Sequence, residues 1–202
     1  LVDSVYELEI KDLDQDGDND LIAAVLMGQQ LNWYENDGNG NFTTRNIQHN
    51  YYWQTVSVGD LDGDNDLDII AGSNSHGLIW YENDGSENFT GRTTPITTRP
   101  INDITIVDLE GDGDEDILVV EDITTPPVSW LQNDGSGNFT QQTITTIEDD
   151  IEFIDTGDID RDGDLDFVYS SHSDEIIGWY ENDGSQNFSR NIIISGQFNL
   201  YG

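Results

Sequence analysis

Four nine-residue segments carry acidic side chains on alternate positions: DLDQDGDND, DLDGDNDLD, DLEGDGDED and DIDRDGDLD. Their acidic positions 1, 3, 5, 7 and 9 are Asp12, Asp14, Asp16, Asp18, Asp20; Asp60, Asp62, Asp64, Asp66, Asp68; Asp108, Glu110, Asp112, Asp114, Asp116; and Asp158, Asp160, Asp162, Asp164, Asp166. Two unit charges about 5 Å apart repel by about 3 kcal/mol at an effective dielectric constant near 20, and converging carboxylates form several such pairs. A compact loop of this composition therefore requires a cation.

The type of ligand indicates which cation. Carboxylate oxygens are hard ligands, the chain has no cysteine, and no histidine lies in the four segments, which argues against zinc and copper. Mg²⁺ prefers fewer carboxylates and a stricter octahedron, whereas Ca²⁺ accepts many oxygen ligands in a flexible arrangement. We predict one Ca²⁺ per segment, four in all. The side chains of positions 1, 3, 5 and 9 and the backbone carbonyl of position 7 are the predicted ligands.

Two other interpretations of the segments are weaker. An EF-hand also begins D-x-D-x-D-G, but it needs a glutamate at position 12 and flanking helices. Position 12 is here Ala23, Ala71, Val119 or Tyr169, and apolar strand-like residues follow the segment. A merely solvated acidic turn gives no reason for strict alternation of the acids.

A second motif follows each acidic segment and indicates what positions it. The motif is WYENDGNGNF from Trp33, WYENDGSENF from Trp80, WLQNDGSGNF from Trp130 and WYENDGSQNF from Trp179. Asn-Asp-Gly between apolar runs is typical of a hairpin turn, because glycine supplies a positive φ and the Asn or Asp side chain caps the turn. The acidic segments themselves begin 48, 48 and 50 residues apart.

Each repeat is predicted to contain four short strands, with the acidic segment between the first two and the Asn-Asp-Gly turn between the last two. We therefore predict an all-β fold, a β-propeller of four-stranded antiparallel blades with four repeats in this chain. The expected blades are approximately 1–48, 49–96, 97–146 and 147–196, with 197–202 the start of a further strand. Because blades stack face to face, the four motif tryptophans are predicted to be core residues.

At these motifs the sequence resembles the FG-GAP or VCBS-type repeat, although the literal Phe-Gly and Gly-Ala-Pro signatures are absent. The acidic pattern, preceded by an alternating strand and followed by an apolar one, carries the resemblance over essentially the whole chain. Members of that family form calcium-binding propeller blades, as in integrin α-subunit heads and many secreted bacterial proteins. The resemblance implies a secreted or cell-surface location, and recognition or adhesion more often than catalysis.

Composition restricts the partners. The formal net charge is −36, from 42 acidic and 6 basic residues, which argues against nucleic acid because its binding depends on lysine and arginine. Binding to an anionic membrane surface is disfavoured for the same reason. The longest apolar run, residues 21–27, is too short to cross a bilayer, so no membrane insertion is expected. The chain is 35% hydrophobic, and it should therefore fold.

Loop variation predicts where a ligand binds. The connections at the end of the blades opposite the acidic segments differ between repeats, and Tyr51, Tyr52, Trp53 and Arg99 are candidate ligand contacts there. Trp53 aligns with Val5, Ile101 and Ile151, which also fits a simple apolar slot. The two tyrosines align with no repeated core residue.

We expect a non-enzymatic recognition or adhesion module for carbohydrate or protein. The alternatives are part of a secreted polysaccharide-active enzyme of the lyase type and a structural spacer in a large surface protein. No known catalytic motif supports an enzyme. Family propellers usually have about seven blades. Four blades that close alone, two chains that pair into eight blades, and continuation into a larger ring therefore all remain open.

Overall fold

A computed structural model describes residues 5–25, 29–94, 100–122, 128–144 and 151–196, which form sixteen strands. The first sheet contains β1 (Val5–Lys11), β2 (Asp20–Val25), β3 (Gln30–Asn36) and β4 (Phe42–His49), and the second contains β5 (Trp53–Gly59), β6 (Asp68–Ser73), β7 (Gly77–Asn83) and β8 (Phe89–Thr93). The third contains β9 (Ile101–Val107), β10 (Asp116–Glu121), β11 (Val128–Asn133) and β12 (Phe139–Thr143). The fourth contains β13 (Phe153–Gly157), β14 (Asp166–Ser171), β15 (Ile176–Asn182) and β16 (Phe188–Ser195). Residues 197–202, expected to begin another strand, lie outside the described residues.

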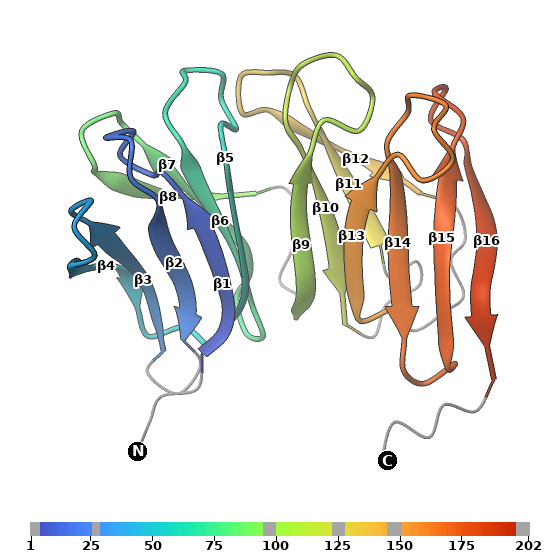
Figure 1. The fold of residues 1–202 in the computed structure, drawn as a ribbon, viewed down its shortest axis with the longest axis horizontal. Coiled ribbons are helices and arrows are strands. Elements are labelled where there is room, and N and C mark those ends of the chain that lie inside the picture. Colours follow the sequence, from blue (N-terminus) through green and yellow to red (C-terminus); the bar gives the residue numbers. More distant parts are fainter. Residues whose placement is uncertain (1–4, 26–28, 95–99, 123–127, 145–150, 197–202) are drawn as a thin grey trace.

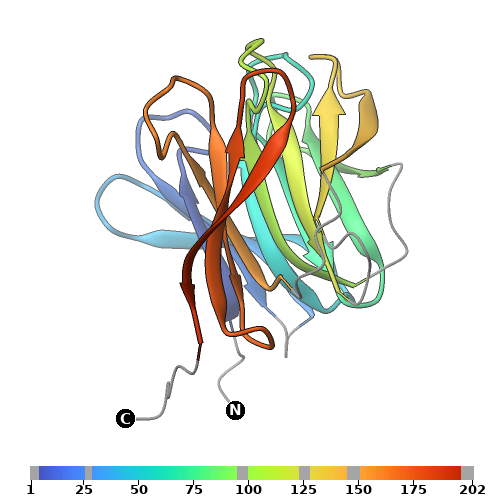
Figure 2. The same ribbon diagram turned by 90° about the vertical axis from the view of Figure 1, so that its right-hand side faces the viewer.

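Each sheet is an antiparallel meander in which strands pair in chain order. The first strands β1, β5, β9 and β13 approach one another in sequence, so they form the inner edge of the array. The four sheets fan out from this edge (Figures 1 and 2). The prediction of an all-β fold built from four-stranded blades is confirmed. Helices are absent from the residues that the structure describes, so none of these residues forms a membrane-spanning helix.

The core consists of three apolar clusters, one between each pair of neighbouring sheets. Trp33, Trp80 and Trp130 are at most 7% exposed and each lies in one of these clusters, as predicted. Between sheets, an edge-to-face contact joins Trp33 to Phe89 of the second sheet at 6.3 Å between ring centroids, and another joins Trp80 to Phe139 at 6.0 Å. Burying an indole contributes about 5 kcal/mol as an upper value, so these tryptophans stabilise the packing of neighbouring blades.

Trp179, the fourth motif tryptophan, is only partly buried. It lies on the face of the fourth sheet that no further described sheet covers. The sequence repeat therefore predicts the position of Trp179 on β15. Its full burial would require a fifth sheet against this face, and the described residues form only four. The acidic segments and the Asn-Asp-Gly turns all lie at one end of the sheets, the upper end in Figure 1.

Candidate functional site

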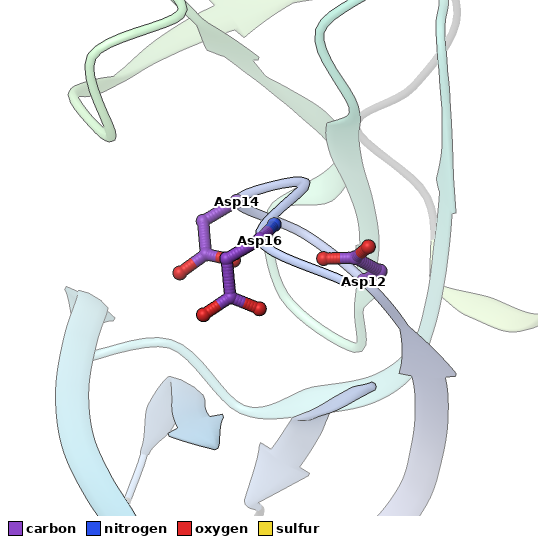
Figure 3. A group of neighbouring side chains, drawn as sticks. All are labelled: Asp12, Asp14 and Asp16. Atoms are coloured by element: carbon purple, nitrogen blue, oxygen red, sulfur yellow. The ribbon is translucent and has the colours of Figure 1, made fainter. Parts of the chain in front are cut away.

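The acidic segments form the loops between the first two strands of every blade. In the first loop, one carboxylate oxygen each from Asp12, Asp14 and Asp16 lies within 4.8 Å of the others. Figure 3 shows these three side chains around the β1–β2 loop, with the Asp12 carboxylate turned toward the other two. Asp60, Asp62 and Asp64 form the same cluster in the second loop. Positions 1, 3 and 5, predicted as ligands from spacing, are thus brought together twice.

The third and fourth loops vary this arrangement. In the fourth loop the clustered carboxylates belong to Asp158, Asp160 and Asp166, at positions 1, 3 and 9. In the third loop, Gln132 donates a hydrogen bond to one carboxylate oxygen of Glu110, and the other oxygen is buried without a partner among the described residues. One buried oxygen of Asp12 and one of Asp62 also lack a partner there. The first, second and third loops therefore each contain a buried carboxylate oxygen without a hydrogen-bond donor among the described residues.

Position 1 also shapes the loop. The backbone N–H groups of Gly63 and Asn65 donate to the two oxygens of Asp60, at 2.8 and 3.0 Å. Asp108 receives the equivalent bonds from Gly111 and Gly113 at 2.8 and 3.0 Å. The loop backbone thereby wraps around the first carboxylate, and Asn65 adopts a φ of 71°, which asparagine tolerates.

Position 9 lies deeper than its neighbours. Asp20, Asp68, Asp116 and Asp166 are 0% exposed. In the second blade, Asp68 accepts a hydrogen bond from the backbone N–H of Leu61 at 3.2 Å and another from that of Asn83 at 2.8 Å. Burial raises the pKa of Asp68 to about 7. This carboxylate joins the acidic loop to the Asn-Asp-Gly turn, a role that the alternation of acids alone does not reveal.

Position 7 points toward that turn rather than toward the cluster. A Cβ atom added to Gly85 would lie 2.3 Å from a carboxylate oxygen of Asp66, and one added to Gly38 would lie 2.1 Å from Asp18. Asp114 and Asp164 approach Gly135 and Gly184 in the same way, at 2.4 Å. With its side chain placed there, position 7 has only its backbone carbonyl left for an ion, in line with the predicted ligand set.

The clustered charges are unfavourable without a counterion. Burial raises the pKa of Asp62, and the charge of Asp64 raises it further. Burial also raises the pKa of Asp14. Clustered carboxylates, unsatisfied buried oxygens and a donor set of oxygen alone fit a hard divalent cation. The loops could therefore hold a metal ion.

A second candidate site lies at the opposite end of the inner strands. A hollow of about 340 Å³ is lined by residues of all four first strands or their approaches: Tyr6, Glu7, Gln54, Asn102, Asp103, Glu152 and Phe153. We call it the axial hollow. Sequence reasoning missed it, although a signal exists. In the first strands, apolar residues mostly occupy the positions two and four before each acidic segment. The position six before it carries a polar group in every repeat: Tyr6, Gln54, Asn102 or Glu152.

Three of the four ligand contacts predicted from the sequence, Tyr51, Tyr52 and Trp53, do not line this hollow. Trp53 is 0% exposed and packs edge-to-face against Tyr81 with ring centroids 5.9 Å apart, so it fills the apolar slot and offers no surface to a ligand. Tyr51 stacks on His76 with ring centroids 3.9 Å apart, and Tyr52 is 46% exposed. Arg99 lies outside the described residues.

Comparison with known proteins identifies the family. The FG-GAP-like repeat matches residues 12–71, 60–119 and 108–169, overlapping stretches that cover most of the chain. The chain belongs to this family. The matched stretches begin at the first aspartates of the first three acidic loops, so the resemblance seen in the sequence is confirmed at the residues that carried it. A search of curated proteins found no match.

Several solved structures share the fold. An Agrocybe aegerita lectin, described as recognising non-reducing terminal N-acetylglucosamine, is 20% identical with a TM-score of 0.65 over 96% of this chain and 53% of the lectin. The V. cholerae biofilm matrix protein Bap1 is 15% identical with a TM-score of 0.58 over 94% of this chain and 28% of that protein. A putative 6-phosphogluconolactonase from Bacteroides fragilis is 14% identical with a TM-score of 0.61 over 96% and 55%. The chain thus spans about half, or less, of these structures.

Proposed function

We propose that this chain is a calcium-stabilised recognition module of a secreted or cell-surface protein that binds a neutral carbohydrate in the axial hollow. The observation that carries the binding proposal is the convergence of four inner strands on one hollow with polar and aromatic side chains. The amides of Gln54 and Asn102 suit sugar hydroxyls, and the rings of Tyr6 and Phe153 suit a sugar face.

The charge of the hollow restricts its ligand. Glu7 and Glu152 line it beside Asp103, whose two oxygens accept backbone N–H groups of Ile104 and Ile154. Gln54 has a buried amide oxygen without a partner among the described residues. Anionic sugars would be repelled, whereas hydroxyl or amide groups of a neutral sugar could donate to these oxygens. The resemblance in fold to a lectin and to a biofilm matrix protein supports an adhesive role, and we assign the chain no catalytic role.

We further propose that the metal is Ca²⁺, one per acidic loop. The four loops lie at the far end of the blades from the axial hollow, so the ions stabilise the scaffold without contacting the ligand. Titration with CaCl₂ followed by calorimetry should find four sites. Removal of calcium by a chelator should lower the melting temperature, and an unchanged melting temperature would contradict the proposal.

Glycan-array binding in calcium, followed by calorimetry on the best neutral glycan, tests the binding proposal. Gln54→Ala should weaken binding at least about tenfold because an amide partner is lost from a partly enclosed site. Tyr52→Ala is the matched control outside the axial hollow. If Tyr52→Ala abolishes binding and Gln54→Ala does not, the site is the Tyr51–His76 surface. Turnover of a polysaccharide, or binding of protein alone, would also contradict the proposal.

A further inference from the structure

The first and last sheets each present an apolar face that no described sheet covers. We call the outer face of the first sheet the head face, formed by Val5, Leu8, Ile10, Leu21 and Phe42. The outer face of the fourth sheet is the tail face, formed by Phe153, Val168, Ile177, Trp179 and Ile194. Strand register places the members of each set on one side of its sheet.

Val5, Leu8 and Leu21 of the head face occupy positions that are buried in every other blade, and the positions of Ile10 and Phe42 are buried or partly buried there. Leu8 and Ile10 are 55% and 61% exposed, whereas Val56 and Val58, at the same positions of the second blade, are 2% exposed. Val5 is 49% exposed, and its three equivalents are 0% exposed: Trp53, Ile101 and Ile151. The head face therefore has the composition of a seam between blades, without a partner blade.

The tail face shows the same relation. Ile177 and Ile194 are each 42% exposed, and their equivalents in the third blade, Val128 and Ile144, are 0% exposed. Trp179 is partly buried, although its equivalent Trp130 is 2% exposed. Contiguous exposed apolar side chains on one face of a folded protein mark an interaction surface.

The two faces are complementary halves of one seam. At each internal seam, a tail-type face with a tryptophan meets a head-type face with a phenylalanine, as Trp33 meets Phe89 and Trp80 meets Phe139. On the free faces, Trp179 lacks its phenylalanine, and Phe42, 49% exposed, lacks its tryptophan. A hollow of about 360 Å³ on the tail side is lined by Phe153 and Ile177, among others. Because Ile151 packs in one cluster with Val128, the equivalent of Ile177, we expect Val5 of a second copy to enter this hollow.

Polar contacts across the seams point to the same pairing. The Asn133 side chain donates to the Leu61 carbonyl of the preceding blade at 2.9 Å, and Asn182 donates to the Leu109 carbonyl at 3.2 Å. Asn36 is the equivalent donor on the first blade, and Ile159 carries the equivalent carbonyl on the fourth. A head-to-tail contact would therefore reproduce the apolar packing of the three internal seams and the asparagine-to-carbonyl hydrogen bond of two of them.

We propose that a second copy of this chain covers these faces head-to-tail, so that two copies complete one ring through two identical seams. Such a heterologous contact either closes or extends into a filament, and closure by two copies buries both faces of each chain. We infer a copy as the occupant because the two faces match each other and because they are equivalent to the faces that already pair at the internal seams.

The test is the mass in solution in millimolar calcium, by sedimentation velocity and native mass spectrometry, over a wide range of concentrations. The wild-type chain should form a species of about 45 kDa, twice the chain mass of 22.6 kDa. Ile10→Glu on the head face and Ile177→Glu on the tail face should each give monomers. Both side chains are exposed in the single chain, so the melting of the monomer should be almost unchanged.

Complementation separates head-to-tail pairing from any other contact. A mixture of Ile10→Glu and Ile177→Glu retains one intact tail face and one intact head face, so it should form a one-to-one pair. This pair has a single seam and should associate at least about 100-fold more weakly than the wild type, which closes two. Tyr52→Glu, an exposed aromatic residue on neither face, should leave dimerisation unchanged.

Four results would overturn the proposal. These are a monomeric wild-type chain at all concentrations, self-association of either single variant, no pairing in the mixture, and growth into a ladder of species larger than the dimer.

Discussion

Asp62→Asn tests the role of the acidic loops most directly, because its effect should depend on calcium. The clustered oxygens of Asp60, Asp62 and Asp64 lie within 4.8 Å of one another. At that distance each pair of charges repels by about 3.5 kcal/mol at a dielectric constant of 20, and by about 0.9 kcal/mol in water. Neutralising Asp62 removes two pairs, so without calcium the variant should be more stable by at least about 1 kcal/mol.

Calcium should reduce that advantage. A site with a dissociation constant of roughly 10⁻⁴ to 10⁻³ M contributes about 1.4 to 2.7 kcal/mol of stability in about 10 mM calcium. Asp62→Asn removes one ligand from one site and should lose much of this contribution. In thermal melts the variant should therefore melt about 2 to 4 °C or more above the wild type in chelator. Its gain in melting temperature on adding calcium should be smaller than that of the wild type.

Glu175→Gln serves as the control, because it removes the same charge from a β14–β15 loop residue at the other end of the sheets. It should change the melting temperature little in either condition. The reasoning would be refuted if Asp62→Asn melted below the wild type in chelator and showed the full calcium-dependent gain. That result would mean that Asp62 supports the loop through contacts of its own and binds no ion.

The remaining predictions concern the scaffold. Gly85→Ala should destabilise the fold by more than about 1 kcal/mol, because Gly85 has a φ of 71° and lies against Asp66. Gly91→Ala on β8 is the control and should be tolerated. Chemical denaturation measures the stability of both variants. Trp130→Ala should cost about 3 to 5 kcal/mol by the same assay, because the indole fills the seam between the third and fourth sheets. Burial raises the pKa of Asp103 to about 7. The folded state thus holds this proton more tightly than the unfolded state, and ionisation of Asp103 reduces stability progressively as the pH rises from about 4 to about 7. Asp103→Asn cannot ionise, so denaturation curves should show the wild type losing stability relative to the variant over this range, by a few kcal/mol at most.

The sequence predicted those parts of the structure that are determined locally. Strand order, the position of the acidic loops and the hairpin turns follow from a pattern of alternating residues and Asn-Asp-Gly that repeats four times. The spacing also predicted side-chain ligands at positions 1, 3, 5 and 9. The first two loops bring positions 1, 3 and 5 together and the fourth brings positions 1, 3 and 9 together, while their role as ligands stays a prediction. These features depend on contacts within one repeat, where the chain supplies both partners.

Features that depend on several blades are harder to predict from the sequence. The axial hollow exists only where four inner strands converge, so its polar residues stand isolated in the sequence, about 50 positions apart. The exposure of Trp179 depends on whether another blade follows it. Trp53 shows the opposite case, since its alignment with Val5, Ile101 and Ile151 indicated an apolar slot and the structure places it there.

Position 9 explains why the acidic loop and the Asn-Asp-Gly turn occur together in every repeat. Asp116 accepts hydrogen bonds from the backbone N–H of Leu109 in its own loop at 3.3 Å and from that of Asn133 in the turn at 2.8 Å. The Asn133 side chain then donates to the Leu61 carbonyl in the loop of the preceding blade. One buried carboxylate and one asparagine thus connect a loop, its turn and the neighbouring loop. An ion that orders one loop would therefore also order the seam beside it, which predicts that calcium stabilises the array of blades cooperatively.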